Sequence, residues 1–287
     1  MAATLTDEQR EHFEREGYVV AHGAVHDDLV VAMIGAIERI INRALDGEFG
    51  DTFRWIGREQ KVPGFMNDLL TAEKYDPAIG EFLEQVIVPD IESLLGEPVR
   101  LSWLLLLTAG AGNPAGVPLH RDNNESGGVN EKELIERFQM KNCLFMAPLL
   151  PDDRFLQIVP GSHLRLATEQ EIAAARALRP CAVDQVEGMT TIEMQPGDVL
   201  YHHTNLLHQG LNPSGSPRWT LLSGLWAASM PLLDIEQQDH ALVGVHGFKD
   251  VLPERCRAAV ERYLEAFGNS PREVTADGPD QDAPVED

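Results

Sequence analysis

In the first hundred residues, apolar positions follow a helical spacing that short extended runs interrupt. The run Thr-Asp-Glu-Gln that begins at Thr6 is a capping box, in which Gln9 reaches back to the backbone of the capping threonine. The helix that it opens should end near Glu16, because Gly17 follows and favours the left-handed backbone of a helix stop. Residues 18–20, Tyr-Val-Val, predict a short strand.

A second and longer helix is predicted from a cap at Asp27 or Asp28 to about Leu45, because apolar residues recur there at helical spacing. A third helical region is predicted over residues 77–95, with Pro89 as a candidate break. Both patterns are amphipathic, so each helix is expected to lay one face against a core.

From residue 99 onward the pattern changes to short apolar runs that are separated by turn signals rich in Gly, Pro and Asp. Many short strands with such punctuation predict an antiparallel barrel or a double-sheet jelly roll. Residues 109–118 predict a Gly- and Pro-rich loop, and residues 131–138 and 168–177 predict helical insertions. The predicted strands are residues 100–107, 144–149, 155–159, 190–194, 198–203 and 219–227.

The expected organisation is one domain over residues 1–268, mainly β with flanking helices. Helices occupy residues 1–98, the β core occupies residues 99–229, and a C-terminal helix over residues 253–267 closes the domain. Residues 269–287 contain six acidic residues, three prolines and a single arginine, and they predict a disordered acidic tail.

The 287 residues carry a formal net charge of −23, of which about −18 belongs to the part before the predicted tail. An acidic protein is repelled by nucleic acid and by anionic membranes, so neither is expected as a partner. The three cysteines are far apart and form no CxxC pair, which argues against a disulfide framework or a cysteine zinc site. The N-terminal residues do not look like a signal peptide, and no apolar run could span a bilayer, so a cytoplasmic location is expected.

A candidate metal site begins with His120 and Asp122, which follow the predicted Gly-rich loop. Residues two apart in an extended segment point to the same side, so this imidazole and carboxylate should converge. His12 and His26 also have an acid two positions later, but His12 lies on a predicted helix and His26 at a helix start. Two histidines and one carboxylate would leave positions open on iron(II) for a chelating cosubstrate and dioxygen.

The second histidine ligand must come from a neighbouring strand, for which the candidates are His163, His202, His203 and His208. His208 is preferred because Arg218 follows it across a Pro- and Ser-rich turn, and a hairpin of that length would place the two side by side. A buried guanidinium can grip a carboxylate, such as the one of 2-oxoglutarate that is remote from a metal. Thr220, on the same strand face as Arg218, can add a hydrogen bond from its hydroxyl group.

Several motifs appear in order along the chain: His-x-Asp at residues 120–122, Val-Pro-Gly-Ser-His at residues 159–163, Pro-Gly-Asp-Val-Leu at residues 196–200, and His208 with Arg218. Together they resemble the phytanoyl-CoA dioxygenase family, and the likeness extends over about residues 4–230. The resemblance implies a double-stranded β-helix, which is a cupin-like jelly roll, and an oxygenase that depends on iron(II) and 2-oxoglutarate. The iron ligands would be His120, Asp122 and His208, and Arg218 would anchor 2-oxoglutarate.

The resemblance also implies that dioxygen and 2-oxoglutarate are consumed to give succinate and CO2 while an unactivated C–H bond of a small molecule is hydroxylated. Desaturation, epoxidation and ring formation remain open as outcomes of the same chemistry. The polar residues 123–138, which begin with Asn123 and Asn124, are predicted to form a lid over the substrate. Because the body is acidic, an amino-acid-derived, peptide-like or secondary-metabolite substrate is favoured over a CoA thioester.

Two interpretations from other functional classes remain open beside the oxygenase. One is a jelly-roll protein that binds a metal or a small molecule without catalysis. The other is a zinc hydrolase with the same ligands, although the sequence contains no HExxH helix to supply its general base. Leu119, the Asp153-Arg154 turn and Gly210 depart from the usual residues of the family, which suggests a subfamily with its own pocket. The oligomeric state is also open.

Overall fold

The structure is a computed structural model, and it describes residues 5–50, 53, 55–57, 59, 61–64, 66–67, 69–109, 115–122, 132, 135, 141–177, 179–212, 215–230 and 251–267. Asn123, Asn124 and most of the predicted lid over residues 123–138 lie outside the described residues. So do most of the predicted helix at 131–138 and the whole of the predicted tail at 269–287.

The described residues contain helices mainly at the two ends of the chain and strands in between. The helices are α1 (Asp7–Glu16), α2 (Asp27–Leu45), α3 (Pro77–Phe82), the π-helical turn η2 (Leu83–Ile87), α4 (Val88–Leu95), the 3-10 turns η3 (Ser162–Leu164) and η4 (Val183–Gln185), α6 (Glu169–Arg176) and α9 (Glu254–Phe267). The strands are β1 (Tyr18–Ala21), β2 (Trp55–Gly57), β3 (Val62–Pro63), β4 (Val99–Arg100), β5 (Leu105–Ala109), β6 (Ala115–His120), β7 (Asn142–Pro148), β8 (Leu156–Ile158), β9 (Thr190–Thr191), β10 (Val199–His203), β11 (His208–Asn212) and β12 (Arg218–Ala227).

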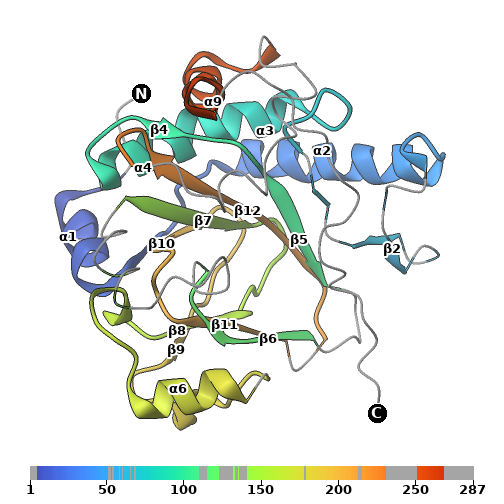
Figure 1. Cartoon of the computed structure of the whole chain (residues 1–287). Coiled ribbons are helices and arrows are strands. Elements are labelled where there is room, and N and C mark those ends of the chain that lie inside the picture. Colours follow the sequence, from blue (N-terminus) through green and yellow to red (C-terminus); the bar gives the residue numbers. More distant parts are fainter. Residues whose placement is uncertain are drawn as a thin grey trace.

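Two antiparallel sheets face each other and form the two layers of a jelly roll, so the predicted fold class is confirmed (Figure 1). The major sheet has the strand order β1-β10-β7-β12-β4, with β5 also paired to β12. The minor sheet has the order β6-β11-β8-β9, and β2 and β3 form a separate two-stranded ribbon. The N-terminal part, predicted to be helical, thus contributes an edge strand to the major sheet, because β1 pairs with β10.

The alternation of side chains along β10 shows how the layers are assembled. Val199 and Tyr201 pack toward the helices, where the hydroxyl group of Tyr201 donates to a carboxylate oxygen of Asp90 on α4 at 2.8 Å. Leu200 points to the opposite face and packs between the two sheets. Because the side-chain period of a strand is two, His202 shares the face of Leu200 and lies between the sheets as well.

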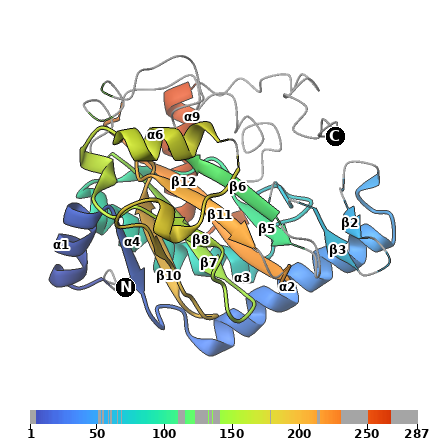
Figure 2. The same cartoon turned by 90° about the horizontal axis from the view of Figure 1, so that it is seen from below.

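Helices cover the outer faces of both sheets (Figures 1 and 2). The largest apolar cluster joins α2, α3, α4 and α9 to the outer face of the major sheet. On the other side, α6 packs beside β6, and a smaller apolar cluster fills the space beneath it. Among the described residues, no helix has both the length and the apolar character that crossing a bilayer requires.

The helix boundaries follow the predicted signals with two corrections. Thr6 and Gln9 form the capping box of α1, and Gly17 ends this helix at a φ of 81°. The cap of α2 is His26 rather than Asp27 or Asp28, because the His26 side chain accepts a hydrogen bond from the backbone N–H of Asp28. Residues 77–95 are helical without a break, because the π-helical turn η2 directly precedes Pro89 and its wider hydrogen bonds, such as Val88 N–H to the Leu83 carbonyl group, accommodate the proline.

Three strand predictions are corrected by the pairing of the sheets. The predicted strand at residues 100–107 is divided between β4 and β5, and residues 101–104 belong to neither. The predicted loop at residues 109–118 is wrong in its second half, because β6 begins at residue 115 and pairs with β11. Only two residues of the segment 190–194 form a strand, and Met194 makes an isolated bridge with Asp153.

Candidate metal and cosubstrate site

The structure brings His120, Asp122 and His208 together at one end of the space between the sheets. His120 is the last residue of β6 and His208 the first of β11, and the two are direct cross-strand neighbours. The Nε2 atoms of both histidines lie 3.4 Å from Oδ1 of Asp122. One potential ligand atom from each of the three residues falls within 4.8 Å of the other two, which is a spacing that a single metal ion can bridge.

Backbone carbonyl groups fix the orientation of both imidazole rings. Nδ1 of His120 donates to the carbonyl oxygen of Pro118 at 2.7 Å, and Nδ1 of His208 donates to that of Leu206 at 2.9 Å. Each hydrogen bond places a proton on Nδ1 and turns Nε2 toward Asp122, so Nε2 is the nitrogen that can give up its proton and bind a metal. This arrangement is typical of histidines that bind a metal.

The Asp122 carboxylate has the electrostatics of a cation site. Burial by itself would raise its pKa, but the charge of His208 and the hydrogen bonds from both histidines outweigh burial and hold the pKa well below its usual range. Its Oδ2 atom is buried and has no hydrogen-bond partner. A buried carboxylate oxygen without a donor is costly, and a metal ion bound between the three side chains would satisfy it. The residues therefore fit a divalent cation.

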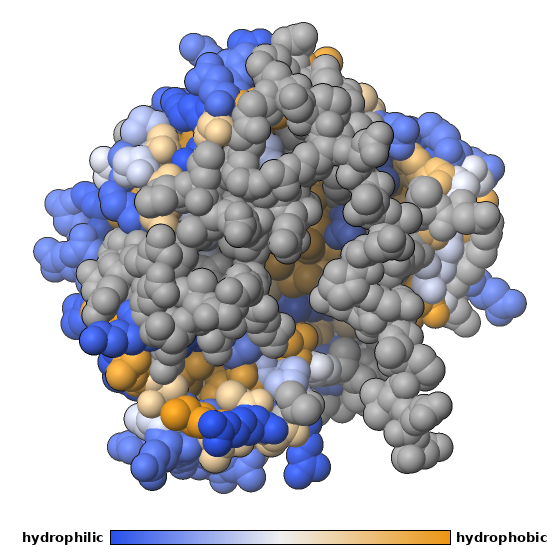
Figure 3. Space-filling view, viewed as in Figure 1, coloured by the Kyte–Doolittle hydropathy of each residue, from blue (hydrophilic) through white to orange (hydrophobic). Residues whose placement is uncertain are grey.

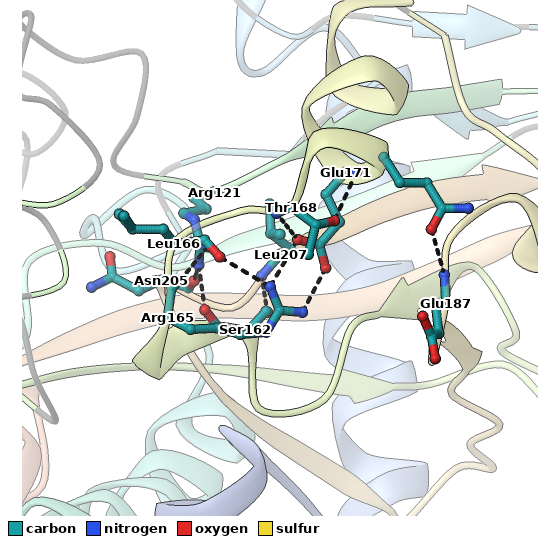
Figure 4. Close-up of polar contacts among 10 residues, drawn as sticks. Arg121, Ser162, Arg165, Leu166, Thr168, Glu171, Glu187, Asn205 and Leu207 are labelled. Atoms are coloured by element: carbon teal, nitrogen blue, oxygen red, sulfur yellow. Dashed lines mark hydrogen bonds and ion pairs between the residues drawn. The ribbon is translucent and has the colours of Figure 1, made fainter.

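Arg121 lies between the two residues of the His-x-Asp motif, and its side chain fixes this segment through hydrogen bonds to the backbone of other segments (Figure 4). Its side chain is only 1% exposed, and it donates to the backbone carbonyls of Ser162, Arg165 and Asn205. The distances to the first two carbonyl oxygens are 2.9 and 3.0 Å. The sequence pattern does not indicate a role for Arg121, because the three carbonyl groups that meet at its side chain come from distant parts of the chain.

The segment that Arg121 holds also leads directly into the second histidine. The backbone N–H of Leu207 donates to the Ser162 side chain at 2.8 Å, so the turn around Ser162 binds both the Arg121 side chain and the residue before His208. Arg165 is held in turn by two hydrogen bonds to Glu171 of 2.8 and 2.6 Å. This network connects the two histidine-bearing strands through a common turn (Figure 4).

Arg218 lies at the first residue of β12 and points toward the opposite end of the same interior. Its Nε donates to Oδ2 of Asp153 at 3.2 Å and to the hydroxyl oxygen of Thr220 at 3.0 Å, and its guanidinium carbon lies 4.7 Å from the ring centre of Phe155. Nη2 is buried without a hydrogen-bond partner. Burial lowers the pKa of Arg218, while Asp153 opposes this effect and keeps the group cationic.

The route by which the chain brings Arg218 to the site differs from the predicted one. A hairpin was expected, but β11 belongs to the minor sheet and β12 to the major sheet, so the connection crosses between the layers. His208 and Arg218 therefore line one interior from opposite walls. Thr220 donates to Asp153, so its hydroxyl group orients the acid that holds the arginine, and sequence analysis had assigned Asp153 only to a turn.

One cavity of about 250 Å³ connects the two groups of residues. Asp122 and both histidines line one part of it and Arg218 lines another. Its walls are largely apolar and come from both sheets, with Leu107, Leu144, Met146, Phe155, Leu156 and Leu222 among the lining residues. Figure 3 shows hydrophobic side chains at the bottom of a hollow near the middle of the face that is viewed.

The other candidate histidines divide into one that lines this cavity and two that do not. The His202 ring lies edge-on to His208 with 5.3 Å between the ring centres, and its Nδ1 is buried without a partner. Burial, and after it the charge of His208, lowers the pKa of His202 to about 4. The His163 and His203 rings are tilted by 44° to each other with 5.3 Å between the ring centres, and Nε2 of His163 donates to the Glu14 carbonyl group on α1 at 3.2 Å.

Two antiparallel sheets face each other, with His, Asp and His at one end of the shared cavity and a buried arginine at the other. Together these features define a class of protein. This is the double-stranded β-helix oxygenase, which uses non-haem iron and 2-oxoglutarate. The chain belongs to the phytanoyl-CoA dioxygenase (PhyH) family, whose model matches residues 13–219, so the resemblance seen in the sequence is confirmed. Iron, 2-oxoglutarate and dioxygen are accordingly its cofactor and cosubstrates.

Solved structures of three proteins share this fold at low sequence identity. AviO1 from Streptomyces viridochromogenes Tue57 is 23% identical with a TM-score of 0.59, over 81% of this chain and 99% of that chain. EctD from S. alaskensis, solved with 2-oxoglutarate and 5-hydroxyectoine, is 19% identical with a TM-score of 0.58, over 80% of this chain and 79% of that chain. SnoK, a non-haem α-ketoglutarate-dependent carbocyclase from nogalamycin biosynthesis, is 18% identical with a TM-score of 0.55, over 78% of this chain and 85% of that chain. No functionally curated protein matches the chain.

Proposed function

We propose that His120, Asp122 and His208 hold iron(II), that Arg218 binds the remote carboxylate of 2-oxoglutarate, and that the enzyme hydroxylates an unactivated C–H bond of a small molecule. The observation that carries the proposal is a pair of complementary unsatisfied atoms in one cavity. Oδ2 of Asp122 is an acceptor without a donor, and Nη2 of Arg218 is a donor without an acceptor.

2-Oxoglutarate complements this pair because it is negatively charged at both ends. Its oxo-acid end can chelate a cation that the histidines and Asp122 hold, and its other carboxylate can then accept hydrogen bonds from Arg218. The walls between the two ends are largely apolar, so a metal ion at one end and Arg218 at the other are the cations that its two carboxylates can meet. A neutral ligand, or a monoanion that binds only at the metal, would leave Nη2 of Arg218 unsatisfied.

The protein's own residues supply orientation and a dry interior. Asp153 and Thr220 hold Nε of Arg218, and the ring of Phe155 lies against the guanidinium plane, so the free Nη2 keeps a fixed direction. When iron(II) is bound, it supplies with 2-oxoglutarate and dioxygen the oxidising power that breaks a C–H bond. The fixed groups place the cosubstrate, and the apolar wall excludes water that would divert the reaction.

The substrate that we propose is a small molecule derived from an amino acid, a peptide-like compound or a secondary metabolite. Three observations favour these classes over a CoA thioester. The chain is strongly acidic, the cavity is small and apolar, and the described residues that line the cavity include no base beyond Arg218 and the histidines. The names of EctD and SnoK also link relatives of this fold to small molecules, namely 5-hydroxyectoine and nogalamycin precursors.

Hydroxylation is proposed over the other outcomes of the same oxidation, although SnoK is named a carbocyclase and the related SnoN an epimerase. Mass spectrometry of the product distinguishes hydroxylation from ring closure, desaturation and epimerisation, and NMR of the product separates an alcohol from an epoxide of the same mass. Hydroxylation adds one oxygen atom to the substrate, whereas ring closure or desaturation removes two hydrogens and epimerisation leaves the mass unchanged. Succinate should be released in all of these cases.

The decisive experiment is an anaerobic titration of the protein with iron(II) and 2-oxoglutarate, followed through the weak visible charge-transfer band of the chelate. We expect a band that is lost in Asp122→Ala and that requires much more 2-oxoglutarate in Arg218→Gln. Arg100→Gln is the matched control, because Arg100 is also buried but donates to the Ala228 and Met230 carbonyls away from the cavity. A folded wild-type protein without a band would refute the proposal, and its metal content would then separate a zinc hydrolase from a non-catalytic binding protein.

A further inference from the structure

The cavity contains a third buried side-chain atom without a hydrogen-bond partner. Asp122 Oδ2 and Arg218 Nη2 are accounted for by a metal ion and a carboxylate, but Nδ1 of His202 has no such assignment. The nitrogen belongs to a residue that is 1% exposed, so bulk water does not satisfy it. A buried polar atom that lines a ligand cavity is expected to find its partner in the ligand.

The strand register places His202 at the end of the cavity that His120, Asp122 and His208 line, which is called the metal end below. His202 on β10 lies opposite Leu144 on β7, which in turn lies opposite Gly224 on β12. Arg218 precedes Gly224 by six residues on the same strand, which corresponds to roughly 20 Å of extended chain. His202 and Arg218 therefore lie toward opposite ends of the major sheet, and the edge-on contact with His208 puts the His202 ring beside the candidate ligands.

The surroundings of His202 on this face are largely apolar. Its cross-strand partners are Leu144 on β7 and Tyr18 on β1, and Leu200 and Met146 follow in the next row, so the Tyr18 hydroxyl is the one polar group among these four side chains. Leucine or phenylalanine would pack there without an unsatisfied nitrogen, so core packing gives no reason for an imidazole. The polar atom gains a function only when a polar group occupies the adjacent part of the cavity.

We infer that His202 is a cosubstrate-binding residue whose Nδ1 forms a hydrogen bond with the carboxylate at the oxo-acid end of 2-oxoglutarate. The inference rests on the proposed function, which places that end next to His208 whatever the substrate is. In this arrangement Arg218 holds the remote carboxylate and His202 holds the near one, so each end of the cosubstrate has one side-chain donor, and the near end also has the metal. A protonated Nδ1 donates to a carboxylate oxygen, which has no proton of its own.

Two oxo acids separate the roles of the two ends. 2-Oxobutyrate has the same oxo-acid end as 2-oxoglutarate but lacks the remote carboxylate, so it can use His202 and cannot use Arg218. In anaerobic titrations of the iron(II)-loaded protein, His202→Phe should weaken both oxo acids by about tenfold, the size expected for one lost hydrogen bond to a charged group, and should shift the charge-transfer band. Arg218→Gln should weaken 2-oxoglutarate and leave 2-oxobutyrate unchanged.

A conservative variant and a matched control distinguish binding from packing. His202→Asn keeps an amide near the position of Nδ1 and should restore most of the affinity for both oxo acids, while His202→Gln, whose amide extends to the position of Nε2, should not. His163→Phe alters another buried histidine with an unpartnered Nδ1 outside the cavity, and it should leave both affinities unchanged.

The results distinguish this inference from the proposed function. A wild-type band with unchanged affinities in His202→Phe and His202→Gln would overturn the role of His202 and leave the proposed site intact. Weakening of 2-oxoglutarate alone, with 2-oxobutyrate unaffected, would also overturn it. Absence of the band in wild-type protein with either oxo acid would instead refute the proposed function.

Discussion

The two ends of the cavity are built by different means. At the metal end, both candidate histidines are oriented by backbone carbonyl groups, and Arg121 holds the same segment through three further carbonyls. At the other end, Arg218 is oriented by side chains, namely Asp153, Thr220 and Phe155. The first end depends on the path of the chain, whereas the second depends on a balance of charges.

The difference extends to what each end lacks. The metal end has a surplus acceptor in Asp122, and the far end has a surplus donor in Arg218. Each surplus is disfavoured in a buried site unless a ligand of opposite character binds. We therefore expect this cavity to select a cation together with a dianion, and the selection should need no contact with the substrate to be oxidised.

The largest effect is expected from removing a ligand at the metal end. His208→Ala should lower iron affinity by more than about a hundredfold, since outer-shell changes alone cost ten- to a hundredfold, and succinate release should fall with it. The metal content of the purified variant and its turnover are the measurements. Without metal, the Tm of His208→Ala should differ little from that of the wild type. The Tm of His163→Ala, which lacks a buried histidine outside the cavity, should fall more. Full activity of the His208 variant would show that another histidine is the ligand.

The second-largest effect is expected from Arg121, and it tests whether its hydrogen bonds to backbone carbonyl groups are needed for iron binding. Arg121→Met removes all the hydrogen bonds to the three carbonyl groups, so we expect iron affinity to fall about ten- to a hundredfold and the charge-transfer band to shift. Arg121→Lys should recover part of the affinity, because an ammonium group can reach some of the same acceptors.

Arg165→Gln is the matched control for this anchor. It breaks the ion pair with Glu171 in the same network but leaves the Arg165 carbonyl group in place for Arg121. It should reduce stability by about 1 to 3 kcal/mol, because the buried Glu171 carboxylate loses donors, and it should leave iron affinity unchanged. Equal losses of iron affinity in the two variants would mean that the network supports folding and does not position the ligands.

The sequence allowed the metal end to be predicted better than the far end, for a physical reason. His120 and Asp122 are local neighbours whose convergence follows from the two-residue period of a strand. The capping box of α1 is likewise a local pattern, and the structure contains it as predicted. The expectation for Arg218 depended on a long-range feature, the sheet to which each strand belongs, and the predicted hairpin was wrong.

The residues that sequence analysis missed all depend on distant contacts. Asp153 lies 65 positions before Arg218, and nothing in its local pattern indicates a partner. Strand β11, with the sequence His-Gln-Gly-Leu-Asn, has no regular apolar alternation and was not predicted as a separate strand. The pairing of β11 with both β6 and β8 determines that it lies inside the minor sheet, and this pairing is a property of the whole fold.

The smallest effect on binding, and the sharpest test of the charge balance, is expected from Asp153→Asn. Both Asp153 and Arg218 are largely buried, with side-chain exposures of 3% and 12%. Removing the negative partner of a buried cation should therefore destabilise the ligand-free protein by about 3 kcal/mol. The remote carboxylate of 2-oxoglutarate can replace the lost charge, so saturating 2-oxoglutarate with iron(II) should raise the Tm of the variant more than that of wild-type protein.

The two ligand-induced Tm shifts are measured side by side with Asp152→Asn as the control, since Asp152 is exposed and contacts Gln195 instead. Equal shifts in variant and wild type would mean that Asp153 only orients the guanidinium, and the far end would then resemble the metal end in depending on geometry more than on charge.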